Sequence, residues 1–574
     1  MDPELKKYRF LQIAILLSFV LILFFSFKLQ IFEGKYYHRL SEENRIKKKY
    51  IIAPRGNIYD RYGRVLANTR PAFYVSIIPA LAEQKTITKI AQIFGIDTTE
   101  IKKKFKIEKN PYVAIKIVRD ISFKQVSMIE EHRSELPGIE VGVEPVRNYP
   151  YADLFCHVLG YVSEITDVEL KLMKEYKIGD YIGRTGIEEQ YEKELSGKDG
   201  IDYVEVDVLG REVGKVAEYR PVPPVPGNDL YTTLDLELCD STAQLLKPYP
   251  RAAVVALNPQ NGEVYVLYSK PGYDPNRFVR GLKAAEWNAL INSQDAPMFN
   301  RTTMSCYPIG STIKPFLALV ALDKGLIEPK KRFEPCTGGL RLGNRIFGCW
   351  KIHGSLNLVE AITHSCDVYF YQLGKFLGID NIAEILYELG FGQPTGIDLP
   401  QEKGGLIPDR NYLNKKYGRS WTEGHIYNLS IGQGDILATP LQLARAYTLF
   451  ANQENVLVVP HLKLHQPPTI KKINKNIEAL QTVREALHRV VLVGTGTLAR
   501  VYGYEVSGKT GTAENPHGED HALFVGYAPT EKPRILVCAL VENAGHGGAV
   551  AAPLVGRIIK IFSEIEKRYS HETE

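Results

Sequence analysis

The chain has 574 residues, of which 44% are hydrophobic and 24% are charged, and its formal net charge is +5. This composition excludes a disordered or collagen-like chain and supplies enough apolar side chains for about three or four domains, or two large ones. The basic residues are dispersed, apart from one cluster at Arg45 and 47–49. Because the sequence has no basic stripe with interleaved aromatic residues, we expect no nucleic-acid partner.

An uncharged run extends from Phe10 to Phe27 and continues beyond Lys28 to Phe32. It is long enough to cross a bilayer as a helix and too long for the core of a signal peptide. We therefore predict a cytoplasmic tail at 1–9 and a transmembrane signal anchor at 10–32, with a buried helix of a soluble protein as the alternative. Basic residues flank the run on both sides, so charge alone leaves its orientation open.

Residues 33–226 combine short strands, turn glycines and charged helical segments, which predicts an α+β domain. The segment Pro221–Pro226, with the sequence PVPPVP, is typical of a stiff connector. We place a domain boundary there and predict a second domain at 227–574. The strands expected in the first domain lie at Val65–Ala67, Phe73–Ile78, Tyr112–Val118 and Tyr203–Val208, and a helix is expected at Glu188–Leu195.

The second domain begins with two β runs joined by a turn-forming segment, which predicts a hairpin. Helices, further strands and a last amphipathic helix follow, and this order is typical of an α+β fold around an antiparallel sheet. The expected hairpin strands are Ala252–Leu257 and Glu263–Tyr268, the later strands Glu505–Lys509, Ala522–Tyr527 and Arg534–Val541, and the main helices Leu358–Leu377 and Pro553–Lys567.

Ser311 and Lys314 lie three residues apart at the expected start of a helix, after Pro308 and Gly310. On a helix this spacing places both side chains on one face. A serine beside a lysine that can take its proton is an arrangement suited to nucleophilic catalysis. A surface serine and lysine on an ordinary helix is the alternative, and this short pattern alone does not decide between them.

Two further motifs follow in order: Ser365-Cys366-Asp367 near another helix, and Lys509-Thr510-Gly511-Thr512 on an expected strand. Together with the first motif they form the ordered set found in penicillin-binding proteins and class A β-lactamases. We expect Gly508 and Gly511 to leave the strand bare, so that a substrate backbone can pair with its edge.

The chemistry of these residue types suggests a division of roles. Ser311 is the expected nucleophile, Lys314 the base for acylation, and Ser365 a relay of a proton to the leaving amine. Backbone N–H groups of Ser311 and Thr512 are expected to form an oxyanion hole. Lys509, with the hydroxyl groups of Thr510 and Thr512, is expected to bind a substrate carboxylate.

Beyond these motifs, the chain resembles the class B penicillin-binding proteins, and within them the penicillin-binding protein 2 group, over nearly its whole length. The resemblance includes PRGNIYDRYGRVLA, RNYPYADLFCHVLGYV and GRTGIEEQYEKELSGKDG in the N-terminal part, and PGYDPN, PIGSTIKPF, SCDVYFYQL, IGQGDILATPLQLARAY and SGKTGTAE in the C-terminal part. The third residue of the middle motif is usually asparagine, whereas this chain and the penicillin-binding protein 2 group have an aspartate, here Asp367. An ionised carboxylate only accepts hydrogen bonds, so a donor role for that residue is in doubt.

The resemblance implies an elongated, non-catalytic pedestal at 33–226 and a penicillin-recognising transpeptidase domain at 227–574. It implies an enzyme of the inner membrane, with its catalytic domain in the periplasm, that cross-links peptidoglycan stem peptides and is inhibited by β-lactams. It also implies contacts with a RodA-type glycosyltransferase and an MreC-type scaffold. A β-lactam-sensing receptor, a D,D-carboxypeptidase and a β-lactamase are the alternatives, but the sequence contains one membrane span and a long segment that a β-lactamase does not need.

Three of the seven cysteines and one of the thirteen histidines form a second group, with the spacing C-x12-C-x3-H-x12-C. Three thiolates and one imidazole make a closed tetrahedral zinc set, and penicillin-binding protein 2 is similar in having a structural zinc site in this region. We expect structural zinc and no organic cofactor. The alternatives are a disulfide between Cys336 and Cys349, and simply buried thiols. The expected ligands are Cys336, Cys349, His353 and Cys366.

Overall fold

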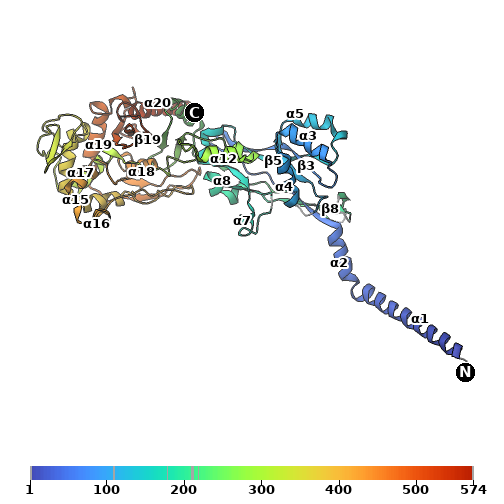
Figure 1. Ribbon diagram of the computed structural model, residues 1–574. Helices are drawn as coiled ribbons and strands as arrows, with labels where there is room; N and C mark the ends of the chain where they lie inside the picture. The colour runs from blue at the N-terminus through green and yellow to red at the C-terminus, as the bar shows by residue number, and fades with distance from the viewer. Residues whose placement is uncertain (1–2, 108–109, 178, 208–211, 217–218, 572–574) are drawn as a thin grey trace. The chain divides into compact units, whose positions relative to one another are not determined.

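The computed structural model describes residues 3–107, 110–177, 179–207, 212–216 and 219–571 (Figure 1). The chain forms two compact units, each assembled from separate stretches of sequence. The domain ranges 33–226 and 227–574 stay a prediction, since in this division residues 147–195 share a unit with the C-terminal part of the chain. The first unit contains Met1–Arg55, Thr69–Val146 and Ser196–Gly227, and the second contains Gly56–Asn68, Arg147–Leu195 and Asn228–Glu574.

The N-terminal helix α1 (Pro3–Phe27) continues into a short π-helical turn at Lys28–Phe32, and α2 (Gly34–Arg45) follows. The most apolar window of 18 residues within Lys7–Phe32 has a mean hydropathy of 2.6, and none of that window is buried. This helix is long and apolar enough to cross a membrane, and it contains the predicted anchor at 10–32.

The first unit has a core of aliphatic residues between three helices and a sheet. Val75 and Ile77 of β3 (Val65–Ile77) pack with Ile87 and Ile90 of α3 (Gln84–Phe94), and all four side chains are buried. Valine and isoleucine suit such a pleated, half-buried surface, because their branched side chains pack well against neighbours. The other elements are α4 (Thr98–Ile107), β4 (Ile115–Ile121), α5 (Phe123–Glu131), β5 (Ile139–Asn148), and the separate sheet β1 (Ile46–Ile51), β8 (Gly200–Val206) and β9 (Glu212–Lys215).

A five-stranded antiparallel sheet lies at the centre of the second unit, and every residue of two of its strands is buried. The antiparallel sheet predicted from the sequence is therefore confirmed, and β17 is the last strand in its order. In spatial order the strands are β12 (Val264–Lys270), β11 (Ala252–Leu257), β19 (Ile535–Val541), β18 (His521–Ala528) and β17 (Ser507–Ala513).

Helices cover both faces of this sheet, as expected. The amphipathic helix α20 (Ala551–His571) packs on β18 and β19, and α18 (Pro440–Ala451) packs on β19 and β11. Figure 1 shows these two helices on opposite sides of β19. The longer remaining helices of the unit are α10 (Leu236–Leu245), α12 (Ala284–Ile291), α13 (Lys314–Asp323), α14 (Leu358–Thr363), α15 (Asp367–Glu388), α16 (Arg410–Tyr417), α17 (Glu423–Ser430) and α19 (Ile477–Leu492).

Shorter elements complete the second unit. They are β2 (Ile58–Tyr59), α6 (Cys156–Leu159), β6 (Val162–Glu164), α7 (Asp167–Leu170), β7 (Tyr181–Gly183), α8 (Gly186–Gln190), α9 (Glu192–Leu195), β10 (Leu230–Tyr231), α11 (Asn276–Arg280), β13 (Gly339–Leu342), β14 (Arg345–Gly348), β15 (Val456–Val458) and β16 (Ile470–Lys472).

Four predicted elements are divided or joined differently in the structure. The helix predicted at Leu358–Leu377 is wrong as one element, because Ser365 has a φ of 53° and separates α14 from α15. A left-handed residue cannot continue a right-handed helix. The helix predicted at Glu188–Leu195 is likewise two short helices, α8 and α9, whereas the two strands predicted at Val65–Ala67 and Phe73–Ile78 are one strand, β3.

A buried ion pair joins two stretches of the second unit that are 41 residues apart. Nε of Arg147 lies 2.6 Å from Oε1 of Glu188, and their side chains are 2% and 0% exposed. Nη1 of Arg147 also donates to the carbonyl of Gly56, and the hydroxyl of Tyr149 donates to Glu188. Removing one partner of such a pair leaves an uncompensated charge in the protein interior.

We therefore expect Arg147→Met to destabilise the second unit by about 3–5 kcal/mol, because Glu188 loses its cation while staying buried. The measurement is thermal unfolding of the full-length protein in detergent. Arg489→Met is the matched control, since Arg489 and Glu485 form an exposed pair 3.9 Å apart, and the midpoint should not move. An unchanged midpoint for Arg147→Met would show that the buried pair contributes little.

Candidate active site

Ser311 lies in a 3₁₀ turn, Gly310–Ile313, that leads directly into α13. In a 3₁₀ turn residues i and i+3 project on the same side, which brings Ser311 and Lys314 together as the spacing predicted. Pro315 has no backbone N–H and fits the first turn of a helix, where that group has no partner inside the helix. The serine of this turn is partly exposed, whereas the lysine three residues later is 0% exposed.

The buried ammonium group of Lys314 contacts the middle motif. Its Nζ donates to the carbonyl oxygen of Ser365 at 2.8 Å and to Oδ1 of Asp367 at 2.7 Å, and lies 3.2 Å from Oγ of Ser365. A buried ammonium group is stable only when its hydrogen bonds are satisfied and an anion is near. Asp367 supplies that anion, and its carboxylate accepts rather than donates, as expected.

Lys509 reaches the same hydroxyl from β17. Its Nζ lies 2.9 Å from Oγ of Ser365 and also donates to the carbonyl oxygen of Thr510 at 3.1 Å. The Ser365 hydroxyl is therefore within hydrogen-bond distance of two buried ammonium groups, one from each of the other two motifs. The structure brings the three predicted motifs together at this hydroxyl.

The two lysines differ in their electrostatic surroundings. Burial, followed by the nearby charge of Lys314, lowers the pKa of Lys509 well below its usual value. Burial raises the pKa of Asp367, and the neighbouring Lys314 ammonium opposes that change. Lys509 is thus the lysine whose neutral form the site favours, whereas Lys314 lies against a carboxylate.

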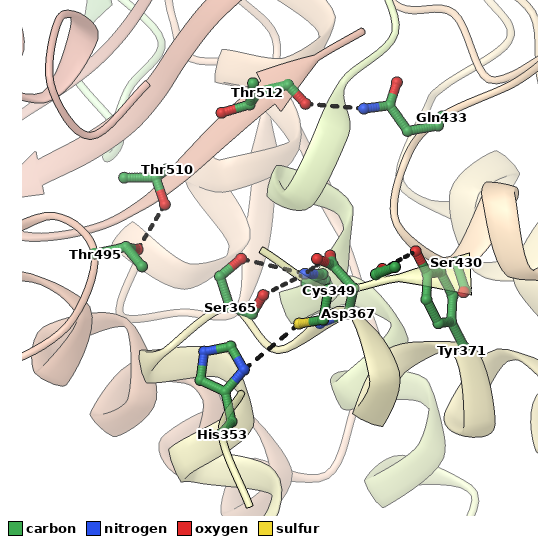
Figure 2. A network of polar contacts seen from close by, with 12 residues as sticks. Cys349, His353, Ser365, Asp367, Tyr371, Ser430, Gln433, Thr495, Thr510 and Thr512 are labelled. Atoms are coloured by element: carbon green, nitrogen blue, oxygen red, sulfur yellow. Dashed lines mark hydrogen bonds and ion pairs between the residues drawn. The ribbon is translucent and has the colours of Figure 1, made fainter. Parts of the chain in front are cut away.

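The strand β17 presents the third motif along its length. Oγ1 of Thr510 lies 2.6 Å from Oγ1 of Thr495, and Oγ1 of Thr512 accepts a long hydrogen bond of 3.4 Å from the N–H of Gly547. The carbonyl oxygen of Thr512 accepts from Nε2 of Gln433 at 3.0 Å, as Figure 2 shows. Sequence reasoning missed Gln433 and Thr495, although Gln433 lies within the quoted stretch IGQGDILATP.

Glycines allow the segments of the site to approach closely. A Cβ atom on Gly432 would lie 2.1 Å from the carbonyl oxygen of Gly310, and one on Gly310 would lie 2.5 Å from the carbonyl oxygen of Thr512. The N–H of Gly310 donates to the carbonyl oxygen of Gly432 at 2.9 Å. The serine turn is therefore held between β17 and the loop after α17 by contacts that only glycine permits.

The expectation that Gly508 and Gly511 leave the strand bare for substrate is wrong. A Cβ atom on Gly511 would lie 2.8 Å from Cγ2 of Thr312, and one on Gly508 would lie 2.5 Å from the carbonyl oxygen of Val525. Protein atoms fill both positions, so these glycines serve packing.

The four predicted metal ligands converge in the structure. Their donor atoms all lie within 4.8 Å of one another, and Nδ1 of His353 lies 3.7 Å from Sγ of Cys336 and 3.5 Å from Sγ of Cys349. Tetrahedral zinc with ordinary bond lengths requires sulfur–nitrogen separations of about 3.6 Å. The arrangement therefore fits that ion, and all seven cysteines are free thiols, including the pair considered for a disulfide.

This cluster is joined to the catalytic motifs. Cys366 lies between Ser365 and Asp367 in the chain, and the N–H of Asp367 donates to Sγ of Cys349 at 3.3 Å. A hydrogen bond from Cys366 lowers the pKa of Cys349 to about 3, while the same bond raises the pKa of Cys366. A thiolate is the form that binds a cation. Figure 2 shows Cys349 and His353 beside Ser365 and Asp367.

Comparisons with known families agree with this geometry. The penicillin-binding protein transpeptidase domain matches residues 252–560, and the penicillin-binding protein dimerisation domain matches residues 50–232. The chain belongs to the penicillin-binding proteins. Within them it belongs to the penicillin-binding protein 2 group, as its relatives and similar structures show.

Among the relatives of this penicillin-binding protein, the peptidoglycan D,D-transpeptidase MrdA of Acinetobacter baumannii is 36% identical over 91% of this chain and 82% of its own length. MrdA of Escherichia coli is 33% identical over 91% of this chain and 89% of its own. Among solved structures, a complex between penicillin-binding protein 2 and MreC from Helicobacter pylori matches with a TM-score of 0.81 and 31% identity, over 90% of this chain and 99% of the other.

Two glycines of the IGQG loop provide a test of the close packing around Ser311. Gly432 and Gly434 both have left-handed backbones, with φ of 73° and 75°. A Cβ on Gly434 would meet its nearest atom at 3.6 Å, whereas one on Gly432 would lie 2.1 Å from the backbone of the serine turn.

We expect Gly432→Ala to displace the serine turn and reduce labelling by fluorescent penicillin at least tenfold. Gly434→Ala carries the same backbone strain, of about 1–2 kcal/mol, without the collision, so labelling should stay within about threefold of the unsubstituted protein. The second-order labelling rate of each purified variant is the measurement. Equal effects of the two substitutions would contradict the packing argument.

Proposed function

We propose that this penicillin-binding protein is a peptidoglycan D,D-transpeptidase of cell elongation that works through an acyl-serine. The observation that carries the proposal is the convergence of Lys314, Ser365 and Lys509 on one hydroxyl beside the Ser311 turn. The relatives in the comparison are named peptidoglycan D,D-transpeptidases, and a receptor, carboxypeptidase or β-lactamase is not favoured.

In the first half of the reaction, Lys314 first passes a proton through the Ser365 hydroxyl to Lys509, which leaves Lys314 neutral and Lys509 cationic. Oγ of Ser311 then bonds to the carbonyl carbon of the penultimate D-alanine, and its proton passes to Nζ of Lys314. Backbone N–H groups of Ser311 and Thr512 stabilise the negative oxygen that forms. The carbon–nitrogen bond to the terminal D-alanine then breaks, and the leaving nitrogen takes a proton through Ser365, which lies 3.2 Å from Lys314. D-Alanine leaves, and the stem peptide remains as an ester of Ser311.

In the second half, the amine of a neighbouring stem peptide attacks the ester carbonyl. The new carbon–nitrogen bond forms, the bond to Oγ of Ser311 breaks, and the proton lost by the amine returns to the serine through the same groups. Lys509 and the hydroxyl groups of Thr510 and Thr512 bind the terminal carboxylate of the donor, for which a cation and hydroxyl donors are suited. Asp367 holds Lys314 in position through the 2.7 Å contact.

Location and partners follow from the same activity. Peptidoglycan lies outside the cytoplasmic membrane, so we place the anchor at 10–32 in the inner membrane and the second unit in the periplasm. One similar solved structure is penicillin-binding protein 2 in complex with MreC, and another is a peptidoglycan synthase complex that coordinates polymerization and crosslinking. These two complexes support an MreC-type scaffold and a RodA-type glycosyltransferase as partners of this chain.

We also propose structural zinc at Cys336, Cys349, His353 and Cys366. The residues fit the ion in donor type, in number and in the separations given above. Bound zinc would cross-link the β13–β14 region to the start of α15, next to Ser365. It would supply no chemistry to the reaction, because four protein ligands leave no open position.

Replacing the nucleophile tests the catalytic assignment. We expect Ser311→Ala to abolish covalent labelling by fluorescent penicillin, because the acyl bond has no oxygen to form on. Labelling is measured by gel fluorescence of the purified full-length protein. Ser293→Ala, in the same domain and outside the three motifs, should label normally. Persistent labelling of Ser311→Ala would remove the assignment.

Metal analysis tests zinc independently of activity. We expect about one equivalent of zinc in protein purified without chelator, and a loss of most of it in Cys336→Ser, because a hydroxyl replaces a thiolate ligand. Cys239→Ser is the control, since Cys239 is buried elsewhere and bonds to the carbonyl oxygen of Tyr265. Less than about half an equivalent in the unsubstituted protein would reject the metal.

A further inference from the structure

The outer edge of β17 carries backbone groups to which a bound peptide could add as a further strand. In a strand, the carbonyl of one residue and the N–H of the residue two positions later point to the same edge. Thr512, near the end of β17, and Glu514, the residue after that strand ends, occupy such a pair of positions.

The side chain of Gln433 forms hydrogen bonds with the carbonyl of Thr512 and the N–H of Glu514. Its Nε2 donates to the carbonyl oxygen of Thr512 at 3.0 Å, and its Oε1 accepts from the N–H of Glu514 at 3.3 Å. A carboxamide has the donor and acceptor of a peptide group, so Gln433 pairs with the strand as one residue of a neighbouring strand would. Gln433 is only 8% exposed, which shows that it is built into the edge.

The position of Gln433 is fixed by its neighbours. The preceding residue, Gly432, is hydrogen-bonded to Gly310 of the serine turn, and the N–H of Gln433 itself donates to the carbonyl oxygen of Asn428 at 2.9 Å. The position of Gln433 therefore depends on the same turn that carries Ser311. Among the residues that the structure describes, β17 pairs with β18 alone in its sheet, and Gln433 occupies its other edge at Thr512 and Glu514.

We propose that Gln433 is a specificity-determining residue that caps the outer edge of β17 and limits how far a bound donor peptide can pair with the strand. This proposal rests on the proposed transpeptidase function. A carbonyl oxygen has two acceptor positions, so a ligand amide shares Thr512 with the cap, whereas the single N–H of Glu514 is blocked. Removing the cap frees both groups for ligands that carry an amide.

A comparison of two penicillins distinguishes pairing with the edge of β17 from the reaction at Ser311. Benzylpenicillin carries a side-chain amide, whereas 6-aminopenicillanic acid has a free amine there and lacks that peptide-like group. We expect Gln433→Met to raise the acylation rate constant for benzylpenicillin by about three- to tenfold, the effect of one or two hydrogen bonds. The rate constant for 6-aminopenicillanic acid should stay within about twofold.

Hydrogen exchange of the ligand-free, full-length protein is the second measurement. The amide of Glu514 should exchange faster in Gln433→Met, because its acceptor is gone. Gln433→Asn, whose amide is one carbon shorter, serves as a second variant if the methionine variant fails to fold. Gln442→Met is the matched control, since Gln442 is also buried and donates to the backbone at Gln393 and Gly404. It should leave the exchange of Glu514 and the ratio of the two rate constants unchanged.

Several outcomes would overturn the proposal. These are unchanged exchange at Glu514, equal changes for both penicillins, or a selective fall for benzylpenicillin. Failure of the proposed function is distinguishable, because the unsubstituted protein would then not be acylated at Ser311 by either compound.

Discussion

The site depends on burying two lysine side chains around one hydroxyl. Lys314 and Lys509 are both 0% exposed, and transfer of an ammonium group from water into a protein is costly unless the charge is paired or lost. Asp367 pairs with Lys314, while the three nearest acceptors of Lys509 are hydroxyl and carbonyl oxygens. Burial lowers the pKa of Lys509, whereas Lys314 lies against a carboxylate. The Ser365 hydroxyl lies within hydrogen-bond distance of both ammonium groups and can pass a proton between them.

This arrangement requires that segments far apart in the sequence approach at backbone distance. The serine turn, β17 and the IGQG loop meet where Gly310, Gly432 and Gly511 leave no room for a Cβ atom. Buried backbone contacts of this kind tolerate little displacement, since protein interiors are packed as densely as organic crystals. The cleft is thereby positioned by the sheet and its helices, and flexible loops contribute little to its geometry.

Much of the fold and of the site could be predicted from the sequence, because the order of the motifs, the runs of apolar residues and the turn residues between them are local signals. The hairpin at Ala252–Leu257, the edge strand and the cysteine–histidine group followed from them. The break at Ser365 could not be predicted, since the helical pattern continues on both sides and the left-handed residue is held by contacts with distant lysines. Gln433 was missed for the same reason: nothing near it in the sequence indicates that its partner is a strand about eighty residues away.

The three residues of the middle motif each face a different part of the site. Ser365 lies between the two lysines, Cys366 belongs to the proposed zinc set, and Asp367 holds Lys314. Consecutive residues cannot move independently, so a shift of Cys366 by a fraction of an ångström changes the distances on both sides of it. Ser365 also has a left-handed backbone, which costs free energy unless its surroundings over-determine it. A metal bound to Cys366 would supply part of that constraint, and its effect on the reaction would be to fix the position of the Ser365 hydroxyl.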